Sequence, residues 1–213
     1  MTMLKKAALG AAVTAALFSA QTMATEAGDI MVRVGAAGVY PTGDSETITA
    51  VSPTAKVEAD SAWSLGLSLT YMVTDNIGVG LLGAYPFTHD VKLKGAGAAD
   101  GKVAEITHLP PTLTAQYYFN NSSAFTPFVG AGLNYTMFWD EKTDGALAGT
   151  NLSLDDSWGY ALEAGLDYSI NDNWMVSAQV YYIDIDTKAD TAVGNIDVQV
   201  DPVAYLFTAG YKF

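Results

Sequence analysis

Two histidines are the side chains of this sequence best suited to acid and base catalysis. His89 and His108 are its only histidines, and an imidazole titrates close to neutral pH. Neither stands in a convincing constellation with a nucleophile, and the chain contains no cysteine. We therefore expect no catalytic residues and no enzymatic activity.

Acidic side chains are the second group that could do chemistry. They gather at 140–144, at 155–156 and at 184–190, but none of these segments has the compact ligand spacing of a metal-binding loop. We interpret them as solvated charges. We predict no metal and no other cofactor.

The elements that must position these side chains are indicated by a strict alternation of large and small residues. In SAWSLGLSLTYMVTDNIGVGLLGAYPF, residues 61–87, almost every second side chain is large and apolar, and most of those between are small or polar. Asp75 and Asn76 interrupt the alternation once. A period of two is typical of strands, and the interrupting turn residues predict a hairpin.

The same alternation recurs along the rest of the chain and predicts eight strands. They cover 28–40, 61–74, 77–87, 105–119, 125–139, 158–170, 174–182 and 205–213. Short turns at 75–76, 120–124 and 171–173 alternate with long connections at 41–60, 88–104, 140–156 and 187–197. This alternation of short and long connections is what an up-and-down arrangement requires, with both termini at the end of the short turns.

Composition and residue placement favour lipid over water around these strands. Half of the residues are hydrophobic and only 15% are charged, where soluble surfaces carry about 25–35%. A soluble eight-stranded binding barrel is the alternative, but its outer face would carry many charges. Here the second face carries small residues that fit a narrow interior, and aromatic residues gather near strand ends as in membrane girdles. We therefore predict an all-β, eight-stranded antiparallel up-and-down transmembrane β-barrel.

The first 24 residues have the pattern of a cleaved export signal. Lys5 and Lys6 precede an apolar stretch at 7–18 that is too short to span a bilayer, and a small-residue cleavage site ends at Ala24. Cleavage leaves residues 25–213 as a single barrel domain. It removes two of the 10 basic residues and none of the 23 acidic ones, so that the net charge becomes −15. So acidic a chain is not expected to bind nucleic acid.

Several segments of the sequence resemble the OmpW family of outer-membrane proteins. They are AGDIMVRVGAAGVYPT, LTYMVTDNIGVGLLGAYPFTHD, THLPPTLTAQYYF, FTPFVGAGLNYTMFWD, LDDSWGYALEAGLDYSINDNWMV, YYIDIDT and the terminal LFTAGYKF. The resemblance implies an eight-stranded barrel in the Gram-negative outer membrane, with a hydrophobic lumen proposed to pass small apolar molecules. It also implies a bulky aromatic at Tyr181, which here adds a hydroxyl. The terminal Phe213 resembles the signature read by the outer-membrane assembly machinery.

Large apolar side chains on the inward parity are the first functional candidates. Leu82 and Tyr181 lie near mid-strand, and we predict that they form a lumen constriction, a hydrophobic gate. Two interpretations are open, because such side chains either fill the barrel or line a path for apolar molecules. The other apolar residues expected to line the lumen are Met31, Met72, Phe128, Phe138, Ile183 and Leu206.

Prolines on two neighbouring predicted strands are the second candidates. Pro86 on one strand and Pro110 and Pro111 on the next each remove a donor from the strand ladder. The strands are expected to separate there. One hypothesis is a lateral opening through which an apolar ligand leaves into lipid, and the other is a bulge that only shapes the wall.

Three charged residues share the inward parity. Arg33, Glu163 and Asp167 are placed inside because Arg or Lys on the lipid face costs about 2–4 kcal/mol at the midplane. We interpret this inner charge cluster as structural, a polar plug that blocks water and ions.

Together these patterns predict a multi-pass barrel of the cell outer membrane, with its termini in the periplasm, that passes small hydrophobic molecules. The alternative is a plugged structural or interaction barrel, acting as an envelope stress component or a surface receptor. The expected partners are outer-membrane lipid, small hydrophobic molecules, the assembly machinery and lipopolysaccharide. Divalent cations would bridge the phosphates of lipopolysaccharide to the acidic residues of the long connections.

Overall fold

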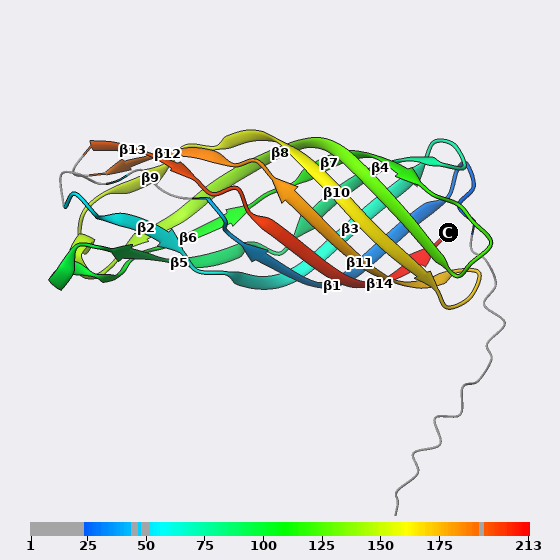
Figure 1. Ribbon diagram of the computed structural model, residues 1–213, viewed down its shortest axis with the longest axis horizontal. Helices are drawn as coiled ribbons and strands as arrows, with labels where there is room; N and C mark the ends of the chain where they lie inside the picture. The colour runs from blue at the N-terminus through cyan, green and yellow to red at the C-terminus, as the bar shows by residue number, and fades with distance from the viewer. Residues whose placement is uncertain (1–23, 44–46, 48–51, 192–193) are drawn as a thin grey trace, which may run out of the picture.

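The computed structural model describes residues 24–43, 47, 52–191 and 194–213 of the chain. The predicted leader lies outside these ranges except for Ala24, and its cleavage stays a prediction. Most of the described residues form strands, which wind into one elongated barrel with both ends of the described chain near one extremity (Figure 1). No helix within these ranges is long and apolar enough to cross a membrane.

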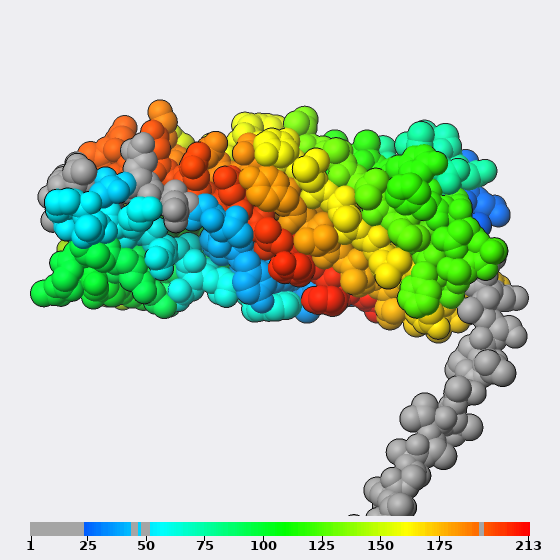
Figure 2. Space-filling view, in the orientation of Figure 1, coloured from blue at the N-terminus to red at the C-terminus, as the bar shows by residue number. Residues whose placement is uncertain are grey.

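Eight antiparallel strands of the described chain close the barrel, which confirms the predicted fold class. The last strand pairs with the first, from Met31 opposite Lys212 to Tyr40 opposite Val203. Closure gives the backbone of each strand a partner on both sides, as lipid requires. Figure 2 shows β1, β14 and β11 side by side as tilted bands on one face. In order around the wall, the strands are β1 (Ile30–Tyr40), β3 (Ala62–Met72), β4 (Ile77–Ala84), β7 (Thr112–Tyr118), β8 (Phe125–Thr143), β10 (Ser157–Ser169), β11 (Trp174–Ile183) and β14 (Val203–Lys212).

Side-chain parity separates the outer face of the barrel from its interior. On β3 the side chains of Leu65, Leu67 and Leu69 are exposed, whereas those of Ser68 and Thr70 are buried. The other barrel strands show the same arrangement, which is the reverse of that in a soluble protein. Large apolar side chains on the outside and small or polar ones inside fit a lipid surround.

Aromatic residues form a belt at each end of this apolar surface. Near the termini Trp174 packs edge-on against Tyr211, with ring centroids 5.0 Å apart. At the other end Tyr40 packs edge-on against Trp63 at 6.1 Å. Belts of this kind lie at the two membrane interfaces, so they bound the span of the barrel within lipid.

The wall continues past the second belt, where the sequence predicts long connections. The structure corrects this expectation: pairing with neighbouring strands, rather than local propensity, orders much of these polar, glycine-rich segments. We call this part of the barrel the head. It consists of β2 (Lys56–Ala59), β5 (Phe87–Lys94), η1 (Gly97–Ala99), β6 (Gly101–Leu109), the end of β8, η2 (Gly145–Leu147), β9 (Leu152–Leu154), β12 (Asp186–Thr191) and β13 (Gly194–Gln199).

Leu67 provides a test of where the lipid lies, because it stands at the centre of β3 with its side chain exposed. Leu67→Arg is expected to lower the free energy of unfolding by about 2–4 kcal/mol, since a guanidinium at the midplane loses its hydration. Val73→Arg, just beyond the end of β3, is the matched control and should cost about 0–1 kcal/mol. Urea unfolding in lipid vesicles measures both variants. Equal costs would contradict this placement of the membrane.

Candidate functional site

Arg33 lies in the barrel interior with its side chain fully buried. Its Nη2 lies 2.6 Å from Asp167 Oδ2, and its other nitrogens donate to Ser177 Oγ at 3.2 Å and Thr70 Oγ1 at 3.0 Å. Nη2 also donates to the hydroxyl of Tyr118 at 3.1 Å. A buried ion pair of this kind is stable only with such additional hydrogen bonds.

Glu163 is the second buried carboxylate of the interior, and neutral donors surround it. Thr114 Oγ1 donates to its Oε2 at 2.8 Å, and Gln116 Nε2 donates to the same oxygen at 2.9 Å. The hydroxyl of Tyr181 donates to Oε1 at 2.6 Å. The predicted gate residue Tyr181 thus directs its hydroxyl towards the charge cluster.

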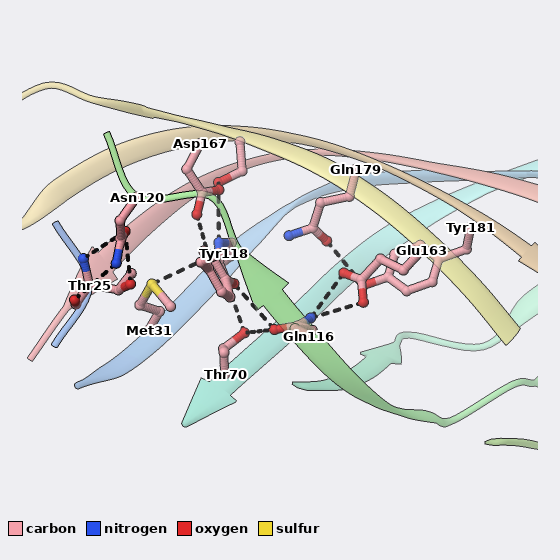
Figure 3. Close-up of polar contacts among 12 residues, drawn as sticks. Thr25, Met31, Thr70, Gln116, Tyr118, Asn120, Glu163, Asp167, Gln179 and Tyr181 are labelled. Carbon is pink, nitrogen blue, oxygen red and sulfur yellow. Dashed lines mark hydrogen bonds and ion pairs between the residues drawn. The ribbon is translucent and has the colours of Figure 1, made fainter. Parts of the chain in front are cut away.

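Gln116 joins the two carboxylates into one network across the lumen. Its Oε1 accepts from Thr70 Oγ1 at 3.1 Å and from the Tyr118 hydroxyl at 3.2 Å, while its Nε2 donates to Glu163. Figure 3 shows the resulting chain of bonds from Asp167 to Tyr181. Residues from opposite sides of the barrel take part. We call this network the polar plug, and it lies where the sequence places the inner charge cluster.

An apolar cluster fills the lumen between the polar plug and the termini. The rings of Phe128 and Tyr118 stack with their centroids 4.7 Å apart, and Arg33 Cζ stands over the Phe128 ring, 5.6 Å from its centroid. Met31, Met72 and Met175 complete it, each almost fully buried. Met31, Met72 and Phe128 therefore point inward as predicted, but they pack against one another rather than around an open channel.

A second apolar layer lies between the polar plug and the head. Leu82 and Tyr181 belong to it and are 6% and 1% exposed, so the lumen is filled at the predicted constriction. Phe87 extends this layer to the first residue of β5. The other predicted lumen residues in this layer are Ile183 and Leu206, which are buried, and Phe138, which packs against them.

Above this layer the head contains a partly open cavity of about 150 Å³. One side of it is lined by β2, β5 and β6, for example by Val57 and Leu93, and the facing side by Leu154 and Val198 of the three-stranded sheet β9–β12–β13. Its lining is predominantly apolar. The sequence does not predict this cavity, because the cavity is formed by segments that the sequence assigns to long connections. The apolar residues at 87, 91 and 93, which alternate with the polar residues at 88, 90 and 92, are a signal that could have indicated it.

His89 and His108 lie at the end of this cavity nearest the apolar layer. Their rings stack with centroids 4.9 Å apart, and His108 also stacks on Phe87 at 5.7 Å. Both residues belong to strands of the head, His89 to β5 and His108 to β6. Burial lowers the pKa of His89 despite its bond to the Asp60 carbonyl. Burial, and the neighbouring His89, lower the pKa of His108 to about 3, so both imidazoles are neutral at neutral pH.

The prolines mark a break in the barrel wall. The β4–β7 ladder ends at Leu82 opposite Thr112, and the β5–β6 ladder begins at Phe87 opposite His108. Between these points, in a stretch described in full, residues 83–86 and 109–111 are not paired with each other. Pro86, Pro110 and Pro111 cannot donate to a ladder there.

Each side of this break stays bonded to its other neighbour. Tyr85 N donates to Leu65 O at 2.8 Å, and Tyr135 N donates to Pro111 O at 3.1 Å. On the outer face, no atom lies within 4 Å of where a side chain at Gly83 would stand. We call this interruption, confined to residues 83–86 and 109–111, the wall gap. It lies at the level of the apolar layer.

Comparisons with known proteins cover almost the whole chain. The model of the OmpW family matches residues 26–213. Outer membrane protein W of Vibrio cholerae serotype O1 is 42% identical over 221 residues, 99% of this chain and 100% of that protein. The crystal structure of OprG from Pseudomonas aeruginosa has a TM-score of 0.81 at 42% identity, over 90% of this chain and 99% of that one. The solid-state NMR structure of AlkL in DMPC lipid bilayers has a TM-score of 0.69 at 26% identity, over 89% of this chain and 92% of that one.

Arg33 allows a test of the polar plug. Arg33→Met is expected to lower the free energy of unfolding by about 3–5 kcal/mol, because Asp167 stays buried without its guanidinium. Arg33→Met/Asp167→Leu should regain most of that loss, since an apolar pair needs no hydrogen bonds. Urea titration followed by tryptophan fluorescence measures both. If the double variant is as unstable as the single one, the ion pair is not what the plug depends on.

Proposed function

Since the chain belongs to the OmpW family of outer-membrane proteins, we propose that this barrel carries small apolar molecules from the outside into the outer membrane. The observation that carries the proposal is the wall gap, which lies beside an apolar layer and directly below an apolar cavity. A molecule bound in the cavity would pass Leu82 and Tyr181 and leave sideways into lipid. The route is mainly apolar.

The polar plug supports a lateral exit over a straight passage to the periplasm. An apolar molecule moving straight through would have to separate Arg33 from Asp167 and displace the donors around Glu163. Leaving such groups buried without partners costs several kcal/mol. A sideways step at the level of Leu82 and Tyr181 avoids that cost. The plug would also keep water and ions from crossing.

We further propose that the head faces the outside and that the termini lie in the periplasm. The short turns and both ends of the described chain share one extremity, as in bacterial outer-membrane barrels. Outer-membrane lipid would surround the apolar belt, and the acidic side chains of the head would contact lipopolysaccharide phosphates through divalent cations. Phe213 is mostly exposed while its backbone bonds to Ile30 and its ring packs edge-on against Tyr211, so that the assembly machinery could still reach it.

A plugged barrel with a structural or receptor role is the second candidate function. It is favoured by the filled lumen at Leu82 and Tyr181 and by the polar plug below them. The two candidates differ in one measurable property. Only the transport proposal requires uptake of apolar solutes that depends on this protein.

Removing the two side chains at the constriction tests the route through the apolar layer. In Leu82→Ala/Tyr181→Ala the lumen beside the wall gap is emptied, so the uptake rate of a radiolabelled apolar solute is expected to rise several-fold. Leu81→Ala/Val180→Ala, the adjacent pair on the lipid side, is the matched control and should leave uptake unchanged. Cells lacking the protein give the baseline. Wild-type uptake at that baseline would favour the plugged barrel.

Restoring donors at the wall gap tests the lateral exit separately. Pro86→Ala/Pro110→Ala/Pro111→Ala returns three N–H groups and lets the ladder close, so uptake is expected to fall several-fold. Pro127→Ala, on β8 near the terminal end, is the control and should have no effect. Uptake that stays at the wild-type rate in the triple variant would exclude the lateral exit while leaving transport itself in place.

A further inference from the structure

The cavity in the head is lined mainly by apolar residues, and the stacked rings of His89 and His108 line its inner end. We propose that this imidazole pair is a hydrogen-bonding site, and that the molecules it selects are small aromatic compounds carrying one O–H or N–H donor, such as phenols or indoles. The inference rests on the proposed function and specifies its substrate class.

The hydrogen bond of His89 fixes which nitrogen is free to accept. Its Nδ1 lies 2.6 Å from the backbone carbonyl oxygen of Asp60, and a carbonyl oxygen can only accept. Nδ1 therefore carries the proton, and in a neutral ring Nε2 is left with a lone pair. The structure gives Nε2 no hydrogen-bond partner among the described residues, although the residue is 95% buried, with 5% of its surface exposed. An unmet acceptor at an apolar cavity calls for a donor from a ligand.

His108 adds a second polar edge at the same place. It is as buried as His89, and its ring makes no hydrogen bond to any residue that the structure describes. A neutral imidazole has one donor and one acceptor nitrogen, and His108 can offer both to a ligand. The buried Nε2 of His89, without a partner beside a cavity otherwise lined mainly by Val, Leu, Ile and Ala, is costly unless a ligand serves it.

The rings around the pair favour a flat ligand. Phe87 stacks on His108 with an interplanar angle of 24°, and Phe138 lies 5.8 Å from His108 on a tilted plane. Four aromatic rings therefore meet at the inner end of the cavity. Aromatic ligands gain binding free energy from offset stacking or edge contacts with such rings, whereas a saturated chain gains it only from the burial of its apolar surface. The site lies beside the apolar layer, where a molecule bound for the wall gap would pass.

The experiment compares three probes that share one ring system. 2-Naphthol has an O–H donor, 2-methoxynaphthalene keeps the oxygen without the donor, and naphthalene has neither. Equilibrium dialysis against lipid nanodiscs with and without the full barrel measures saturable binding and subtracts partition into lipid. The proteins compared are the wild type, His89→Phe, His108→Phe and, as a matched control, Thr88→Val, whose side chain is exposed on the neighbouring position of β5.

We expect the wild type to bind 2-naphthol about tenfold more tightly than the other two probes, the size of one hydrogen bond gained by an unmet acceptor. His89→Phe should remove most of this preference while keeping naphthalene binding, His108→Phe should reduce it, and Thr88→Val should keep it. Equal affinities of the wild type for all three probes overturn the inference and leave the proposed transport standing. This comparison needs no variant to fold.

Two further outcomes also overturn the inference. The first is a preference for 2-naphthol that survives in both His89→Phe and His108→Phe, which would place the hydrogen bond elsewhere. The second is the absence of saturable binding for every probe. That result would show that the cavity does not bind apolar molecules, and it would contradict the proposed function as well. The outcomes thus separate failure of the histidine site from failure of transport.

Discussion

The closed ladder of backbone hydrogen bonds is the constraint on which the rest of this structure depends. Lipid offers no water to an unpaired N–H or C=O, so the strands must close on themselves, and β14 bonds to β1. Closing only eight strands leaves a narrow interior. Every large polar side chain that the lipid excludes then meets others in a small space. The contacts of Arg33 with Asp167, and of Glu163 with Tyr181, follow from this crowding as much as from any selected role.

The same constraint bears on the wall gap, where the ladder between two neighbouring strands stops. Unpaired backbone is costly in lipid, so such a break has to be short, and this one is confined to residues 83–86 and 109–111. Prolines reduce the cost further because they carry no N–H to leave unsatisfied. The wall gap, the apolar layer and the cavity of the head follow one another along the barrel. The proposed passage of apolar compounds from water into lipid depends on their order rather than on any one of them.

The period of two explains why the barrel could be predicted from sequence and why the head could not. Leu65, Leu67 and Leu69 alternate with small residues, and that contrast indicates both the strand and its faces. Parity alone also brings Arg33 and Asp167 inside. It cannot show that Gln116 links them to Glu163, because that contact depends on the relative register of several strands. His89 and His108 meet because β5 and β6 pair beyond the prolines, in segments whose glycines and lysines obscure the alternation. Such contacts between separate segments are set by register that no local pattern carries.

The pairing of β1 with β14 also affects how fast the barrel can close during folding. These strands lie at opposite ends of the chain, and Lys212 reaches back to contact Asp29 and the carbonyl of Ala24. Contacts between residues so far apart in sequence form slowly, because the intervening chain must first be brought together. Until the final strand arrives, β1 and the growing sheet each present an open edge, which is a template for pairing with other chains. A barrel of this kind is therefore vulnerable for as long as it is unfinished. Its last ten residues decide when that period ends.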